Sequence, residues 1–163
     1  MRILTNLIVL LMVCGFTLSA CDLPRDPQRT LKQIKARGIR VGWSPNPPFV
    51  VRTGNQPSGF EVELIQRLAG SLNTEVVWIS GGLEEHLREL SRFEIDLVAA
   101  GLSSDTPWRG RVALSKPYAF SERKASEQRV LALPPGENAW LLMVDKFLLK
   151  HRDEIERQIL EAK

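Results

Sequence analysis

The sequence contains very few cysteine and histidine residues. Both cysteines, Cys14 and Cys21, lie near the N-terminus, and the two histidines, His86 and His151, are far apart in the chain. Because no cysteine follows residue 21, the main part of the chain has no internal disulfide. We expect both histidines to be solvated on charged helices. With no cysteine ligands near them, we expect no metal site and no cofactor.

The sequence also lacks a strong charge of one sign. Its 163 residues include 22 basic and 19 acidic side chains, which gives a formal net charge of +3. These charges are interleaved, and no run of Lys and Arg exceeds three positions. The electrostatic pattern of a nucleic-acid-binding protein is therefore missing. With 44% hydrophobic and 25% charged residues, the composition is typical of one globular domain.

Motifs for catalysis are missing as well. No serine lies in a nucleophile elbow, and no glycine-rich phosphate loop is found. The acidic pairs Glu61 with Glu63 and Glu84 with Glu85 fall in the expected first turns of helices. Carboxylates at such positions interact favourably with the helix dipole and usually act as caps. We therefore expect no enzymatic activity.

Residues 1–20 have the features of a secretory signal. Arg2 precedes the apolar stretch LIVLLMVCGFTLSA, which is shorter than a membrane-spanning helix. Residues 18–21, LSAC, resemble the bacterial lipobox, in which the cysteine is acylated, with palmitate for example, and becomes the mature N-terminus. We expect Cys21 to be lipidated. The alternatives are cleavage nearby or an uncleaved anchor, and all three place the chain outside the cytoplasm.

Residues 21–29, CDLPRDPQR, have two prolines and balanced charges, which is typical of a tether. An aspartate directly after a lipidated cysteine, here Asp22, resembles an inner-membrane retention signal. We expect a lipid-anchored protein of the cell envelope, on the periplasmic face of the inner membrane or the outer face of the cell membrane. The folded part is expected to cover residues 30–163.

Helical and strand periodicities alternate from residue 31 to residue 100. Helices are expected at 31–38, 59–72 and 83–90, and strands at 39–43, 74–80 and 94–100. The last strand is apolar on both faces, as in a parallel strand covered by helices. This alternation predicts an α/β fold with a parallel-rich sheet and helices on both faces.

The stretch GLSSDTPWRG, residues 101–110, follows the last of these strands. Thr106 and Pro107 suit a helix start, because Thr caps free amides and Pro has none to leave unpaired. Anions bind where a strand ends before a helix N-terminus, and Arg109 could contact a carboxylate there. The alternative is an ion pair between Asp105 and Arg109 on the surface.

Several segments resemble one protein family. GFEVELIQRLAGSL at residues 59–72 resembles the signature of bacterial extracellular solute-binding proteins of family 3, which serve polar amino-acid ABC transporters. IRVGWSPNPPF at 39–49 resembles the family's first strand and loop, and residues 94–118 resemble its ligand loop. RVLALPPGENAWLLMVDKFL at 129–148 resembles its C-terminal return strand and helix. The resemblance implies a type II periplasmic-binding-protein fold.

The chain departs from the family where a second lobe would follow. Members have two α/β lobes, whereas here about ten residues, AFSERKASEQ at about 119–128, connect the flanking strands. A second lobe would need on the order of 100 residues. The resemblance therefore implies a truncated member with a single lobe. The lobe-two acid that usually holds a ligand's ammonium group has no counterpart.

The same resemblance implies a ligand site for a carboxylate. In amino-acid binders, the first lobe supplies an arginine and amides to the α-carboxylate, and an aromatic side chain lies on the ligand. The residues that correspond here are Arg109, Ser103, Gly101, Ser104, Ser44 and Phe49. Trp43 is a second candidate for the aromatic position, and core packing is the alternative for both aromatic side chains.

The C-terminal segment is expected to form a helix with one apolar stripe. Its first half should cover the sheet, and its second half either packs on the same lobe or extends to meet a partner. The stripe consists of Trp140, Val144, Phe147, Leu148, His151 and Ile155.

Two functions remain open at this point. The first is a small binding protein that catches an amino acid or a similar carboxylate for a transporter permease. The second is an interaction or accessory lipoprotein that has kept the lobe without tight ligand binding. A lone lobe offers one wall of the cleft, so we expect weak binding unless a second copy or a partner protein closes over it. The aromatic side chains Trp43, Phe49 and Trp108 are expected near that exposed wall.

Overall fold

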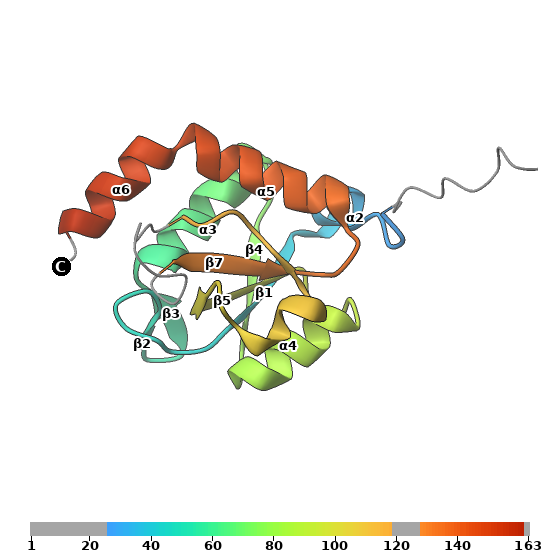
Figure 1. Ribbon diagram of the computed structural model, residues 1–163, viewed down its shortest axis with the longest axis horizontal. Coiled ribbons are helices and arrows are strands. Elements are labelled where there is room, and N and C mark those ends of the chain that lie inside the picture. The colour runs from blue at the N-terminus through green and yellow to red at the C-terminus, as the bar shows by residue number, and fades with distance from the viewer. Residues whose placement is uncertain (1–25, 119–127, 162–163) are drawn as a thin grey trace, which may run out of the picture.

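The computed structural model describes residues 26–118 and 128–161, shown in colour in Figure 1. A five-stranded sheet forms its centre, with the strand order β4-β1-β5-β7-β6. The first strand of the chain, β1 (Ile39–Trp43), lies parallel to both β4 (Val76–Ser80) and β5 (Leu97–Ser103). The return strand β7 (Arg129–Leu133) runs antiparallel to β5 and pairs with β6 (Ala113–Leu114).

The sheet is therefore mixed, with a parallel half that confirms the expected α/β class. Its antiparallel half follows from the path of the chain. β5 ends at Ser103, and β7 begins at its register partner Arg129, so the chain returns into the sheet from the edge at which β5 leaves it. A hairpin of β2 (Val51–Thr53) and β3 (Gln56–Ser58) lies outside this sheet.

Helices cover both faces of the sheet (Figure 1). Successive side chains of β5 point to opposite faces, so Leu97 and Ala99 belong to one core cluster and Val98 and Ala100 to another. The larger cluster includes side chains from α2 (Thr30–Arg37), α3 (Phe60–Ser71), α5 (Asn138–Lys150) and α6 (Arg152–Glu161). The smaller cluster lies under α4 (Leu83–Ser91).

The C-terminal segment forms two helices, because α5 ends at Lys150 and α6 begins at Arg152. Five members of the expected apolar stripe, Trp140, Val144, Phe147, Leu148 and Ile155, are buried in the larger core cluster. Arg67 of α3 also forms a 2.6 Å ion pair with Glu154 of α6. The terminal helix thus packs on its own lobe, which confirms that alternative.

The two flanks of the predicted connector lie side by side. The amide of Tyr118 donates a 2.9 Å hydrogen bond to the carbonyl of Arg129. A short connector is sufficient to join residues that close. Except for Gln128, the connector itself lies outside the described residues, so its predicted exposure stays a prediction.

The prediction that His86 is solvated is wrong. Its side chain is 1% exposed, and its Nδ1 lies 2.8 Å from Glu89 Oε2. The ring fits against the backbone of β1 because Gly42 has no side chain: a Cβ there would lie 2.6 Å from the ring carbon Cγ. His86 lies on the inward face of α4 together with Leu87 and Leu90, and the charged residues elsewhere on this helix do not expose that face.

Within residues 26–118 and 128–161, no helix combines the length and the apolar character needed to cross a bilayer.

Candidate functional site

The predicted ligand residues come from loops at the carboxyl edge of the parallel strands. Ser44 directly follows β1, and its amide donates to the carbonyl of Ala99 in β5 at 3.1 Å. The Ser44 hydroxyl is largely buried and donates to the carbonyl of Gly81 at 2.8 Å. The hydroxyl therefore links the ends of β1 and β4 inside the lobe.

Gly101 interrupts β5 with a left-handed backbone, at φ +57°. A Cβ at this position would lie 2.6 Å from Phe49 Cδ2 and 2.7 Å from Asn46 Nδ2, so the close approach of that loop requires glycine. The Gly101 amide donates a 2.9 Å hydrogen bond to Glu61 Oε2. This amide is thus turned toward α3 and bonded within the lobe.

Ser103 and Asp105 form a local pair at the end of β5. The Ser103 hydroxyl donates a short hydrogen bond to the Asp105 carboxylate. Asp105 and Arg109, both within the described residues, do not form the ion pair that was the alternative for them. Thr106 does cap the next turn by accepting from the Trp108 amide at 3.4 Å, but that turn is a single 3₁₀ turn, Pro107–Gly110.

A cavity of about 470 Å³ brings two of the predicted residues together, Ser104 and Arg109. Arg109 is exposed and is the one charged residue among the described residues that line this cavity. No side chain in the described part of the chain forms an ion pair with it. The Ser104 hydroxyl is 3.3 Å from Gln128 Oε1. The remaining lining residues are Val112, Ala113, Leu114, Ser115, Pro117, Val130 and Leu141.

This lining suits a small molecule with one anionic end and an apolar body. The guanidinium offers a planar fork of donors that matches a carboxylate. The hydroxyls of Ser104 and Ser115 come from the loop after β5 and from the segment after β6. Gly101, Ser103, Ser44 and Phe49 do not line this cavity. The structure thus divides the six predicted residues into two groups.

The two aromatic side chains predicted to contact a ligand, Phe49 and Trp43, pack against the core, and each has an arginine guanidinium over its ring. Phe49 is partly buried against the larger core cluster, and the Arg129 guanidinium lies 5.1 Å from its ring centre. Trp43 is 1% exposed, with the Arg52 guanidinium 4.6 Å from its ring centre. Our expectation that Trp43 lies near an exposed wall is therefore wrong, because β1 directs this side chain into the core.

A buried carboxylate next to this region was not recognised from the sequence as more than a cap. Glu61 is fully buried, and it accepts hydrogen bonds from the Tyr118 hydroxyl and from the Gly101 amide. Burial raises the pKa of Glu61 to about 7, although both hydrogen bonds act to lower it. Burial also raises the pKa of Tyr118 well above its usual range, and the negative charge of Glu61 adds to that effect.

Glu61 therefore joins three segments that are far apart in the chain. No spacing rule points to Tyr118 as its partner. Tyr118 is the only tyrosine of the chain. A lone buried hydroxyl needs a partner, and a nearby acid is one possibility. Among residues 26–118 and 128–161, no group of three or more His, Cys, Asp and Glu side chains is placed to hold a metal ion.

The model of one protein family matches most of this chain. It is the model of the bacterial extracellular solute-binding proteins, family 3, and it matches residues 39–163. The matched region includes the segment of residues 59–72 and all six predicted ligand residues.

Solved structures of single lobes are similar to this chain. The arginine-bound form of domain 1 from TmArgBP is 27% identical, with a TM-score of 0.66, and the match covers 72% of this chain and 97% of that one. A mutant of the same domain has a TM-score of 0.69 at 26% identity, over 76% of this chain and 98% of the other. An arginine-bound transporter substrate-binding protein from Streptococcus pneumoniae shares the fold at 16% identity, with a TM-score of 0.68, over 78% of this chain and 93% of the other.

Curated relatives are longer than this chain. A "Probable histidine-binding protein" from Campylobacter jejuni is 26% identical over 110 residues, which cover 66% of this chain and 43% of that protein. Membrane-bound lytic murein transglycosylase F from Idiomarina loihiensis is 26% identical over 120 residues, 73% of this chain and 26% of the enzyme. The chain thus spans less than half the length of these relatives.

Proposed function

Because this chain belongs to the bacterial extracellular solute-binding proteins, family 3, we propose that it is an extracytoplasmic, lipid-anchored protein that binds an amino acid through its carboxylate. The proposed site is the cavity that contains Ser104 and Arg109. The proposal includes acylation of Cys21 and a transporter permease as a partner. Catalysis is not part of it.

The observation that carries the proposal is the exposure of the Arg109 guanidinium without an ion-pair partner among the described residues. This guanidinium is exposed in the lining of a cavity, and no carboxylate in the described part of the chain forms an ion pair with it. An apolar lining surrounds it, as expected for a site that recognises a small molecule. The two lining hydroxyls, of Ser104 and Ser115, are already hydrogen-bonded within the lobe, so the guanidinium is the main group left for a carboxylate. The similar single domain from TmArgBP, solved in an arginine-bound form, supports binding by one lobe without the other.

The binding is expected to be weak in the monomer. Only one wall of a cleft is formed, so the ion pair with the ligand stays hydrated and contributes only about 0 to 1 kcal/mol. A dissociation constant of about 1 mM corresponds to roughly −4 kcal/mol. Tight binding would require a second copy or a partner protein to close over Arg109.

A second candidate function is supported by the other four predicted residues. The Gly101 amide, the Ser44 hydroxyl and the Ser103 hydroxyl each donate to a group of the lobe itself. Phe49 packs under Arg129. Groups that are already bonded have less to offer a ligand, so an accessory protein that keeps the lobe without tight ligand binding is the alternative.

Calorimetric titration of the protein with arginine, histidine and acetate tests the two functions. We expect saturable binding of an amino acid near 1 mM, lost in Arg109→Ala. The matched control is Arg111→Ala, since Arg111 is an exposed neighbour that stacks on Trp108 and does not line the cavity. If no ligand saturates the wild type, or if Arg109→Ala binds as well as Arg111→Ala, the accessory function is favoured.

A further inference from the structure

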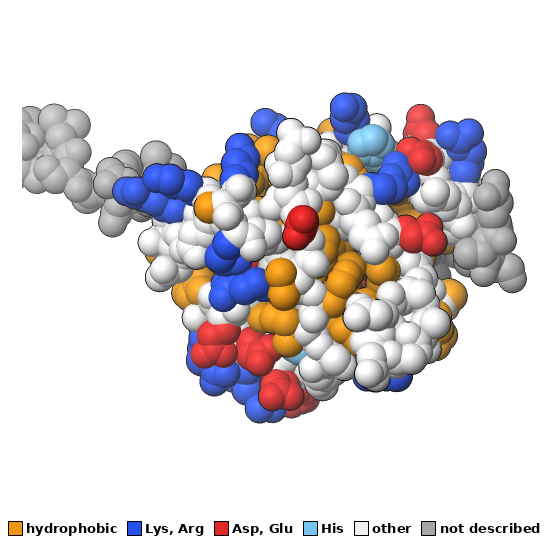
Figure 2. Space-filling model, turned by 180° about the vertical axis from the view of Figure 1, so that it is seen from behind, with side chains coloured by type: hydrophobic (Ala, Val, Ile, Leu, Met, Phe, Trp, Pro, Cys, Tyr) orange, Lys and Arg blue, Asp and Glu red, His pale blue; other side chains and the backbone are white. Residues whose placement is uncertain are grey.

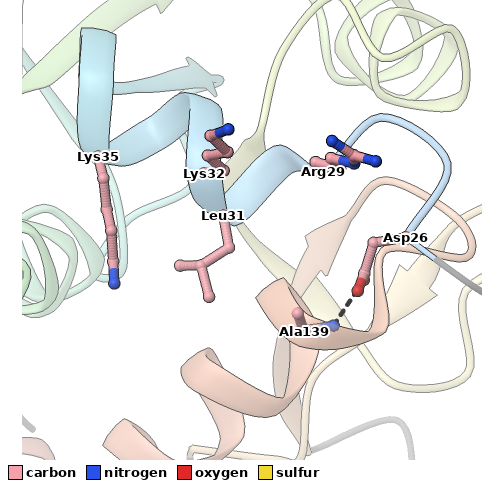
Figure 3. A pocket seen from close by; sticks show the side chains of 6 residues that line it. All are labelled: Asp26, Arg29, Leu31, Lys32, Lys35 and Ala139. Carbon is pink, nitrogen blue, oxygen red and sulfur yellow. Dashed lines mark hydrogen bonds between the residues drawn. The ribbon is translucent and has the colours of Figure 1, made fainter.

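A second cavity, of about 350 Å³, lies between the start of α2 and the start of α5. Figure 3 shows its six lining residues: Leu31, Lys32 and Lys35 of α2, Ala139 of α5, and Asp26 and Arg29, which precede α2. Asp26 is the only acid among these described lining residues, and the Asp26 Oδ1 atom accepts a 2.7 Å hydrogen bond from the Ala139 amide. The acid therefore serves to cap α5.

The three cations of this cavity are free to meet an anion. Arg29, Lys32 and Lys35 are exposed, and no acidic side chain in the described ranges forms an ion pair with them. In the space-filling view, Lys and Arg side chains gather at the left end of the described molecule (Figure 2). This arrangement favours a surface with many negative charges over a single small anion, because the three cations are exposed around a cavity that opens to solvent.

Exposed apolar side chains continue this surface along α5. Leu142 is 53% exposed and Leu149 is 63% exposed, and they are two of the three large hydrophobic side chains that stand out from the described surface. Leu142 follows Ala139 by three residues, and Leu149 follows Leu142 by seven, so all three share one side of the helix. Lys146 lies between the two leucines and is also exposed. We call Arg29, Lys32, Lys35, Leu142, Lys146 and Leu149 the α2–α5 face.

Asp26, the first described residue after Cys21, lies at this same face. Asp26 lines the cavity, and five residues of extended chain span at most about 17 Å. The segment after Asp26 is firmly attached, because the buried carboxylate of Glu137 accepts hydrogen bonds from the amides of Gln28 and Thr30, both at 2.7 Å. A lipid on Cys21 would therefore hold the α2–α5 face close to the bilayer.

From this convergence we infer that the α2–α5 face lies against a membrane of anionic phospholipid. Arg29, Lys32 and Lys35 contact lipid phosphates, and Leu142 and Leu149 enter the boundary between headgroups and acyl chains. The site of Arg109 is then held at a fixed orientation to the membrane. The inference rests on the lipid attachment included in the proposed function, and it adds the lipid chemistry and the docking surface.

The test uses the full chain, expressed and processed in bacteria, purified in detergent and returned to vesicles. One set of vesicles contains phosphatidylcholine alone, and the other contains phosphatidylcholine with phosphatidylglycerol. Hydroxyl-radical footprinting with mass spectrometry then measures the oxidation rates of Leu142 and Leu149. Val77, which is 48% exposed in β4, is the control within the same molecule.

We expect the oxidation of Leu142 and Leu149 to slow severalfold on phosphatidylglycerol vesicles only, while Val77 is unchanged. Each basic residue removed from the surface should weaken the contact by about fivefold. The double variant K32Q/K35Q should therefore lose the protection. R88Q/R92Q removes one exposed cation from α4 and one from the residue that directly follows it, on the opposite side of the sheet, and should keep the protection.

Three results would overturn the inference. They are equal protection of Leu142 and Leu149 on both vesicle types, protection of Val77 equal to that of the two leucines, and an equal loss of protection in both double variants. Sedimentation separates the lipid anchor from the face. If the wild-type protein fails to sediment with phosphatidylcholine vesicles, acylation of Cys21 is contradicted. If the same protein sediments with phosphatidylglycerol vesicles and Leu142 is protected there, membrane contact by the α2–α5 face is still supported. Sedimentation with neither contradicts both.

Discussion

The hydroxyl of Tyr118 donates a hydrogen bond to the buried carboxylate of Glu61, across 57 positions of sequence. Glu61 lies in the first turn of α3, and Tyr118 is the last described residue before the connector. The same carboxylate accepts a hydrogen bond from the amide of Gly101 in β5. Glu61 thus connects two segments to the first turn of α3. One is β5, and the other is the segment that ends at Tyr118.

This carboxylate should make stability depend on pH in an unusual direction. Burial raises the pKa of Glu61 from its ordinary 4.5 to about 7, so the folded state holds its proton more tightly than the unfolded state. The stabilisation from this group is complete below about pH 4.5 and is lost as pH rises through 7. The loss amounts to roughly 3 kcal/mol.

Glu61→Gln keeps the shape of the side chain and cannot ionise. The free energy of unfolding of Glu61→Gln, minus that of the wild type, should therefore rise by up to about 3 kcal/mol between pH 4.5 and pH 8. Urea denaturation over this range measures it. Glu63→Gln changes an exposed carboxylate of the same helix turn and should leave the pH profile unaltered. A profile of Glu61→Gln parallel to the wild type would contradict the assignment.

The carboxylate of Asp96 should stabilise the fold above acidic pH. Burial alone would raise the pKa of Asp96, but hydrogen bonds from Arg37 and Arg40 lower it below its ordinary 3.8. The group therefore contributes stability above that pH, and the contribution is lost as pH falls further. Asp96→Asn should cost about 3 kcal/mol at pH 7, since it leaves two arginines without their partner.

Denaturation of Asp96→Asn at pH 7 and at pH 3 measures this effect, with a smaller cost expected at the lower pH. Glu84→Gln is the control, because Glu84 pairs with Arg88 on the exposed side of α4. Its cost should stay below about 1 kcal/mol. Equal costs in the two variants would show that burial adds nothing to the Asp96 ion pairs.

Two glycine substitutions should change stability in opposite directions. A Cβ on Gly42 would lie 2.6 Å from His86 Cγ and 2.8 Å from Ile95 Cδ1, so Gly42→Ala should cost about 1 to 3 kcal/mol through overpacking. Gly70 lies within α3 with nothing within 4 Å of an added Cβ. Gly70→Ala should stabilise the protein by about 0.5 to 1 kcal/mol, because alanine favours helix. Thermal unfolding of both variants compares them directly.

Acylation at Cys21 can be tested in living cells. Labelling with a fatty-acid analogue should tag the wild type, and Cys21→Ala should remove the label and release the protein from the membrane fraction. Cys14→Ala changes the only other cysteine and should leave the label in place. A wild-type protein that is unlabelled and fully soluble would contradict the proposed acylation of Cys21.

Local patterns in the sequence were enough to predict the class of fold. The strand at 39–43 has the predicted bounds, the return strand begins at residue 129 as the resemblance implied, and the helices α3 and α4 agree with their predicted bounds within a residue. Apolar periodicity depends only on which side of an element is buried, so neighbouring residues specify it. The single lobe was implied by the family resemblance instead, because only about ten residues stand where members of the family have a second lobe.

Contacts between distant residues determined the rest, and no local pattern encodes them. The partner of Glu61 is Tyr118 because α3, β5 and the segment that ends at Tyr118 meet at one point, and burial there turns an expected cap into a carboxylate with a raised pKa. His86 is enclosed because Gly42 of another element leaves room for its ring. The direction of the Gly101 amide depends on a backbone turn at φ +57°, and this turn bonds the amide to the lobe itself. Arg109 and Ser104 share a cavity because β6 and β7 bring its other walls beside them.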